Sequence, residues 1–302
     1  MNNSTTDKTA AAVRRSSFPA WYDFLVLALL FIASQAVLLA VSRCCGLSNE
    51  IIQTIHSADE APAELAWDQV QSLDAARHTA ARATAAGYAA GMSLMIVLTL
   101  IYRRLRGSHA RTARISVRGL DPWLILKGMV VIAAASIVTE PLMRLLPGAP
   151  DYSLIGHGGW ALLSTVVCAP LLEEFLFRGI ILESVRERYG AAAAWVIPAL
   201  LFGAAHGLPP QILAAAVIGL ILGDVCLRSG SLAGCMILHA LNNAAALLML
   251  TVTGSDDIAF RDMVSERAYP FVYAAAAAIF ALWLTGAIRR VIVLRRAEKA
   301  AQ

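Results

Sequence analysis

Six ionisable or amide side chains interrupt strongly apolar runs in the second half of this chain. They are Glu173, Glu174, Arg178, His206, His239 and Asn243. A charge at the centre of a membrane helix costs roughly 2.5–3.5 kcal/mol on insertion scales, so two adjacent glutamates and an arginine in such a run need a reason to be there. Groups of this kind form proton or ion paths, act as counter-ions of ligands, or catalyse reactions.

Helical spacing gives these side chains different roles. Glu174 and Arg178 are four residues apart, so they share a helix face and can pair. Glu173 points about 100° away from them and keeps a free carboxylate. His239 and Asn243 are also four residues apart and can both donate hydrogen bonds to one oxygen atom. The pattern therefore supplies a carboxylate base and a pair of donors.

Chain geometry predicts that these groups lie at a similar depth. If Tyr189–Gly190 is a turn between two antiparallel helices, Glu173 and His206 lie about sixteen residues before and after it and meet at one level. His239 lies about one to two turns into the helix that follows the RSGS turn. Pro170, just before the glutamates, frees a backbone carbonyl in the preceding turn and opens the helix to water.

The composition requires that membrane helices position the site. The 302 residues are 58% hydrophobic and 15% charged, with a mean hydropathy of +0.64, whereas soluble domains are typically ~25% charged. We therefore expect an all-α, polytopic transmembrane helix bundle. Eight runs are long enough to cross the hydrocarbon. They cover about 21–42, 86–102, 123–141, 159–177, 192–208, 210–227, 232–252 and 270–288.

The distribution of charge predicts the orientation of the bundle. Lys and Arg gather in the N-terminal tail, in the 103–122 connection and in the C-terminal tail, whereas the 45–85 and 253–269 connections are mainly acidic. The positive-inside rule then places both termini in the cytoplasm. This rule, with attraction to anionic lipid, accounts for the net charge of +4, so the lipid bilayer is the expected partner and no nucleic acid is needed.

The chain divides into four predicted regions. Residues 1–20 form a disordered cytoplasmic tail, 21–158 accessory transmembrane helices, 159–252 a four-helix core, and 253–302 the last span with a basic cytoplasmic tail. The extracytoplasmic segment 45–85 ends in an Ala-rich stretch that either extends the second span outward or lies on the surface. Tryptophans near the span ends are expected to be interfacial anchors. They are Trp21, Trp160, Trp195 and Trp283.

Three motifs in the 159–252 region resemble those of the CPBP family, the intramembrane CAAX proteases and related bacterial enzymes also called the Abi family. EExxxR is present as Glu173-Glu174-Phe-Leu-Phe-Arg178, FxxxH as Phe202-Gly-Ala-Ala-His206, and HxxxN as His239-Ala-Leu-Asn-Asn243. Each motif alone is weak evidence for the resemblance, but the three motifs together and in this order are specific to the family. The resemblance does not extend to the first three spans or the last one.

The resemblance implies a role for each motif residue. Glu173 would be the general base that activates water, assisted by His206, and His239 with Asn243 would hold the oxyanion. Glu174 and Arg178 would orient that base, and Phe202 would shape the pocket. The chemistry agrees, because a carboxylate in a low-dielectric site is a better base near neutrality and preorganised donors stabilise a developing oxyanion.

The expected function is that of an intramembrane endopeptidase which cleaves near the cytoplasmic face. Its substrate would be a membrane-associated protein or peptide, either prenylated or the precursor of a secreted peptide. The Ala-rich composition indicates a bacterial source, so we expect a multi-pass protein of the bacterial cytoplasmic (inner) membrane.

Three alternatives use the same residues. Glu173, His206 and His239 would make a three-ligand catalytic zinc site, although the chain has no HExxH motif and the resemblance implies no required metal or other cofactor. A proton-coupled transporter would also bury Glu and His, but the chain shows no inverted repeats or paired broken helices. A non-catalytic membrane scaffold would have no need to retain six costly polar residues.

Overall fold

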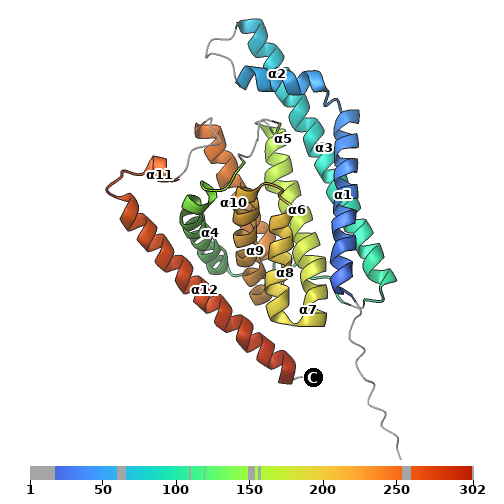
Figure 1. Cartoon of the computed structure of the whole chain (residues 1–302), viewed down its shortest axis with the longest axis vertical. Helices are drawn as coiled ribbons and strands as arrows, with labels where there is room; N and C mark the ends of the chain where they lie inside the picture. The colour runs from blue at the N-terminus through green and yellow to red at the C-terminus, as the bar shows by residue number, and fades with distance from the viewer. Residues whose placement is uncertain are drawn as a thin grey trace, which may run out of the picture.

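The computed structural model describes residues 18–59, 66–108, 110–118, 120–148, 154–155, 158–253 and 260–300. Within these ranges all regular secondary structure is helical and no strand occurs, which confirms the predicted all-α fold (Figure 1). The first helices are α1 (Trp21–Cys44), α2 (Asn49–Asp59), α3 (Trp67–Leu105) and α4 (Pro122–Met143). One unbroken helical run follows, made of α5 (Gly159–Ala161), η1 (Leu162–Cys168), α6 (Ala169–Glu174), η2 (Phe175–Leu182) and α7 (Glu183–Tyr189). The remaining helices are α8 (Ala191–Ala204), α9 (Pro209–Ser229), α10 (Leu232–Thr253), α11 (Phe260–Met263) and α12 (Tyr269–Ala300).

Six described helices are long and apolar enough to cross a membrane, namely α1, α3, α4, α9, α10 and α12. The other two predicted spans correspond to the run from α5 to α7, which changes helical register, and to α8, a shorter apolar helix. The protein is therefore an integral, multi-pass membrane protein. The count of eight crossings stays a prediction, as does the orientation.

The first and last described segments meet at one end of the bundle. Arg106 at the end of α3 binds Asp23 in the first turn of α1 at 3.0 Å, and the Tyr189 hydroxyl donates to the Pro19 carbonyl at 2.7 Å. Glu298 near the end of α12 accepts from the Ala191 backbone N–H at 2.8 Å. We call this the termini end. The two ends of the described chain lie at the same end of the bundle, which agrees with an even number of membrane crossings.

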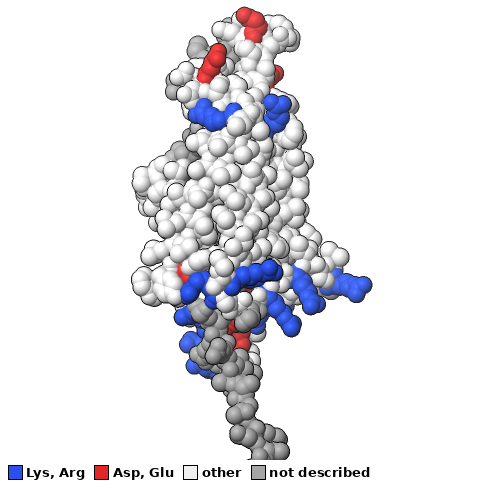
Figure 2. All heavy atoms as spheres, turned by 90° about the vertical axis from the view of Figure 1, so that its right-hand side faces the viewer, with Lys and Arg blue, Asp and Glu red and all other residues white. Residues whose placement is uncertain are grey.

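Charge separates along the bundle as a membrane protein requires. Figure 2 shows Lys and Arg side chains gathered at the termini end, a broad band without charged side chains, and a second charged group toward the opposite end. The predicted tail at 1–20 lies outside the described residues up to residue 17. Phe18 and Ala20, at its end, are buried, and the Ala20 N–H donates to Asp23 at 2.6 Å.

The second half of the 45–85 segment extends the second span outward. α3 has 39 residues, about 58 Å at 1.5 Å per residue, and Ile55 of α2 packs with Leu73 and Ala80 of α3 in a small apolar cluster. Further along, α3 lies directly against α1. A Cβ at Gly87 would overlap the Ser42 Oγ and the Leu38 carbonyl, so glycine permits this close approach.

α12 is attached to the core through a buried carboxylate that sequence reasoning overlooked. Asp224 of α9 is 2% exposed and accepts two hydrogen bonds from Arg290, at 3.0 and 2.6 Å, and one from the Trp283 indole at 3.1 Å. The predicted anchoring role is wrong for Trp195, which is buried and donates to the Leu220 carbonyl at 2.9 Å. These two indoles join helices instead of facing the lipid interface.

Candidate active site

One cavity of about 580 Å³ brings the three motifs together. Its wall includes Glu173 from α6, Phe202 from α8, His206 from the turn after it, and His239 and Asn243 from α10. Gly190, with φ of 80°, makes the predicted turn between α7 and α8, which run antiparallel from it. The shared depth inferred from the chain geometry is therefore realised among these residues.

Glu174 and Arg178 form an ion pair behind the cavity wall. Arg178 Nη1 lies 2.8 Å from Glu174 Oε1, and both side chains are 0% exposed. Arg178 also donates to the Gly219 carbonyl at 3.0 Å, and its guanidinium carbon stacks 4.7 Å from the centre of the Phe202 ring. The predicted i,i+4 pair is confirmed. A buried charge pair of this kind requires such added contacts to offset its desolvation.

His239 lies between the two glutamates. Its Nδ1 donates to Glu174 Oε1 at 2.8 Å, so Glu174 receives both Arg178 and His239 on one oxygen. The other ring nitrogen, Nε2, lies 3.7 Å from Glu173 Oε2, beyond hydrogen-bond distance. Glu174 thus fixes the orientation of the imidazole, which directs Nε2 toward Glu173 and the cavity.

Glu173 receives a hydrogen bond from a helix outside the three motifs. The Tyr88 hydroxyl of α3 donates to Glu173 Oε1 at 2.5 Å. The Glu173 side chain is 15% exposed, whereas that of Glu174 is fully buried, so the two carboxylates lie in different environments. Of the two, Glu173 is the one that can meet water and substrate, as a general base must.

His206, in the turn after α8, is held by the backbone of that helix. Its Nδ1 donates to the Phe202 carbonyl at 2.8 Å, which leaves Nε2 as the nitrogen that carries a lone pair in the neutral ring. The chain then turns at Gly207, with φ of 81°, a conformation that favours glycine. The Phe202 ring packs edge-on against both histidines, with ring centres 4.9 Å from His206 and 5.7 Å from His239. Phe202 therefore shapes the pocket wall.

Asn243 is anchored by a backbone carbonyl that Pro170 leaves free. In the π-helical register of η1, the carbonyl of residue i accepts from residue i+5, and the Ala169 N–H accordingly donates to the Ser164 carbonyl. The next carbonyl, that of Thr165, would need an N–H from Pro170, which has none. Asn243 Nδ2 donates to it instead, at 2.9 Å. One amide hydrogen fixes the side chain and the second remains for the cavity.

The cavity wall includes side chains of the types that metal ions use as ligands. Among the described residues no group of three or more His, Cys, Asp and Glu side chains is arranged to hold one. In particular, His239 uses Nδ1 on Glu174 and keeps Nε2 3.7 Å from Glu173. The three-ligand zinc site, which is the metal alternative from the sequence, stays a prediction.

Two residues of the site carry no recognisable signal in the sequence. Tyr88 lies 85 positions before its partner Glu173, in an Ala- and Gly-rich stretch with no motif. Thr165 contributes a backbone carbonyl, which no residue pattern reveals directly. A tyrosine within an apolar run does not by itself indicate a site residue, because many such tyrosines lie at membrane interfaces.

Comparison with known proteins agrees with this geometry. The family described as type II CAAX prenyl endopeptidase Rce1-like matches residues 156–245, the segment that carries all three motifs. An uncharacterized 24.3 kDa protein of Escherichia coli is 34% identical over 167 residues, which cover 49% of this chain and 73% of that relative. No solved structure matches the chain. The match over the three motifs, together with this relative, shows that the chain belongs to the Rce1-like family of type II CAAX prenyl endopeptidases.

Proposed function

We propose that this protein is an intramembrane endopeptidase in which Glu173 activates water for attack on a peptide bond. The observation that carries the proposal is the position of Glu173, a partly exposed carboxylate oriented by Tyr88 and facing the same cavity as His206, His239 and Asn243. Family membership supports the reaction class. The arrangement supplies the general base and hydrogen-bond donors that hydrolysis of an acyl group needs.

Each step uses a group whose surroundings suit it. Glu173 takes a proton from water as the water oxygen bonds to the carbonyl carbon, and the electron pair of the C=O bond moves to oxygen. The second Nδ2 hydrogen of Asn243 and a proton on His239 Nε2 stabilise that oxyanion. The oxyanion then re-forms the C=O bond as the C–N bond breaks, and Glu173 passes its proton to the leaving amine. This gives a carboxylic acid and an amine, and the acid then loses its proton to solvent.

The role of His239 demands protons on both ring nitrogens. Nδ1–H is used on Glu174 at 2.8 Å, so donation from Nε2 requires the imidazolium. Carboxylates lie near both nitrogens, with Glu173 at 3.7 Å on the other side. Glu174 and Arg178 act through His239 in this scheme, whereas Tyr88 positions the base. No metal is required.

The substrate class follows from the cavity wall. Beyond the polar groups it is lined by Ala214, Ile218, Leu247 and Leu250, so it suits an apolar peptide segment of a membrane-associated protein. The family associates such sites with prenylated proteins, and the precursor of a secreted peptide is the other candidate.

Replacement of Glu173 by glutamine tests the proposal. Glu173→Gln keeps the shape and the hydrogen bond from Tyr88 but cannot take a proton, so we expect hydrolysis of a membrane-anchored peptide by purified enzyme to fall ~10²–10⁴-fold. Glu140→Gln is the matched control, because Glu140 is also buried but pairs with Arg144, 3.7 Å away, outside the cavity. Retained activity in folded Glu173→Gln enzyme, or an equal loss in the control, would refute the proposed base.

A further inference from the structure

The cavity occupies only one half of the bundle. Along α10 its lining begins at His239 and continues to Thr253 at the end of the helix, about 21 Å at 1.5 Å per residue. Along α9 it includes Gln211 near the start and stops at Ile218. From α8 and the turn after it, the lining includes only Phe202 and His206. α10 runs away from the termini end and α9 runs toward it. The lining residues of every helix therefore lie in the same half of the bundle, the half farther from the termini.

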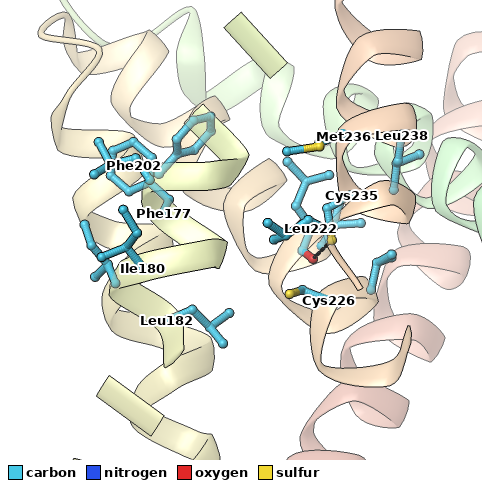
Figure 3. Close-up of a cluster of buried hydrophobic side chains, with 14 of the residues drawn as sticks. Phe177, Ile180, Leu182, Phe202, Leu222, Cys226, Cys235, Met236 and Leu238 are labelled. Atoms are coloured by element: carbon cyan, nitrogen blue, oxygen red, sulfur yellow. Dashed lines mark hydrogen bonds between the residues drawn. The ribbon is translucent and has the colours of Figure 1, made fainter. Parts of the chain in front are cut away.

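In the other half, η2, α9 and α10 are joined by packed apolar side chains, which form a floor beneath the site. Figure 3 shows this cluster, to which α9 contributes Leu222 and Cys226, α10 contributes Cys235 and Leu238, and η2 contributes Ile180. All five are at most 3% exposed. Side chains packed in this way leave no route for water or peptide through this part of the bundle. A separate cavity of about 650 Å³ at the termini end, lined by Arg103, Thr112 and Phe175 among others, shares no lining residue with the site. Substrate therefore does not reach Glu173 from the termini end.

The boundary of the cavity that lies farther from the termini end is formed where two chain connections meet. Residues 205–208 join α8 to α9 after a helix of only 14 residues, and Ile155, in the connection between α4 and α5, also lines the cavity. Because α8 is short, no further turn of this helix fills the space beyond His206, and the cavity occupies that space. This end is opposite Arg106, Gly190 and Glu298, which lie at the termini end.

The termini end carries the charge that marks a cytoplasmic face. Arg103 and Arg104 lie in the last turn of α3, Arg186 and Arg188 in the last turn of α7, and the belt of basic side chains is visible in Figure 2. Basic residues flanking membrane helices remain in the cytoplasm. The cavity, on the other side of the floor, then faces the extracytoplasmic half of the membrane.

We infer that the active site receives its substrates from the extracytoplasmic side. This rests on the proposed peptidase function for the substrate it names. That substrate is an exported, membrane-anchored protein or peptide, cut where its apolar segment lies in the outer half of the bilayer. A lipidated C-terminus on the cytoplasmic face would meet the floor instead. The inference differs from cleavage near the cytoplasmic face, which the sequence alone predicts.

Thiol labelling in whole cells tests the side of access without using proteolysis. Cys44, Cys45 and Cys168 are first replaced by serine or alanine, while Cys226 and Cys235 stay because they are buried. Ala246→Cys then places a reporter in the cavity wall. Leu248→Cys, 62% exposed on the same helix outside the cavity lining, is the matched lipid-facing control. Ser57→Cys on α2 and Ser229→Cys at the end of α9 mark the two ends of the bundle.

We expect a charged, membrane-impermeant thiosulfonate to label Ala246→Cys and Ser57→Cys in intact spheroplasts. Ser229→Cys should react only after permeabilisation, and Leu248→Cys in neither case, because a thiol in hydrocarbon does not ionise. The inference would be overturned if Ala246→Cys, like Ser229→Cys, reacted only after permeabilisation. It would also be overturned by labelling from neither side, by equal labelling of Leu248→Cys, or by external labelling of Ser229→Cys with Ser57→Cys protected.

The substrate class has its own measurement. New N-termini that appear in cells with wild-type enzyme and not with Glu173→Gln should map to extracytoplasmic juxtamembrane segments of exported proteins. Cuts confined to cytoplasmic segments would overturn the inference. If no Glu173-dependent cut exists but Ala246→Cys is still labelled from outside, the peptidase proposal fails while the side of access stands.

Discussion

The hydrogen bond from Tyr88 to Glu173 makes a sharp prediction, because it is the contact that α3 contributes to the proposed base. Tyr88→Phe keeps the ring and removes only the hydroxyl that donates at 2.5 Å. A hydrogen bond to a charged group contributes ~1.5–3 kcal/mol, and 1.4 kcal/mol corresponds to a factor of ten. If that contribution is used to hold Glu173 in its productive position, kcat should fall by about 10- to 100-fold while KM changes little.

The split between kcat and KM separates positioning from a change in binding. The hydroxyl contacts Glu173 and orients it, so its removal should lower kcat far more than it changes KM. An unchanged kcat, or a rise in KM that accounts for the whole loss of kcat/KM, would refute the positioning role.

Tyr102→Phe provides the matched control for this assay. Tyr102 lies on the same helix and donates to a buried carboxylate, that of Asp23, at 2.6 Å, but it does not line the cavity. Steady-state kinetics of the two variants in the same detergent should show the kcat loss only for Tyr88→Phe. Equal effects in both variants would show that the loss comes from loosening α3.

Other contacts give further outcomes. Asn243→Ala should lower kcat ~10²–10³-fold with KM nearly unchanged, which is the usual cost of losing an oxyanion donor. Asn243→Asp should be at least as damaging. A higher KM with unchanged kcat would assign Asn243 to substrate binding. Glu174→Gln leaves the fully buried Arg178 without its carboxylate, so it should destabilise the fold by ~3–5 kcal/mol as well as slow turnover, and an unaltered thermal unfolding temperature would contradict this. Stringent chelation should leave the rate unchanged, whereas loss of activity that zinc restores would favour a metal-dependent reaction.

The sequence predicted those parts of the site that depend on local spacing. The Glu174–Arg178 pair follows from four-residue spacing on one helix face, and the common depth of Glu173 and His206 follows from the turn at Gly190. Both inferences need only helix geometry. Pro170 was correctly expected to free a carbonyl, since proline lacks the N–H that its neighbour needs.

Contacts between helices far apart in the chain could not be predicted in this way. Tyr88 reaches Glu173 from α3, and the carbonyl freed by Pro170 is capped by Asn243 of α10; both depend on how the helices rotate and pack. The direction in which the cavity extends along the bundle could not be predicted for another reason. Residue counts give a depth, but only the short α8 and the packed floor show in which direction the space extends.

The direct test of the central claim is the origin of the oxygen atom in the new carboxylate. A single turnover in ¹⁸O-labelled water, with enzyme in excess over a membrane-anchored peptide, distinguishes a glutamate that activates water from one that attacks the carbonyl itself. Glu173 acting as a base predicts one ¹⁸O atom in the product of the first turnover and none in Glu173. An unlabelled product carboxylate, with ¹⁸O found in the Glu173 side chain by peptide mass spectrometry, would contradict the account.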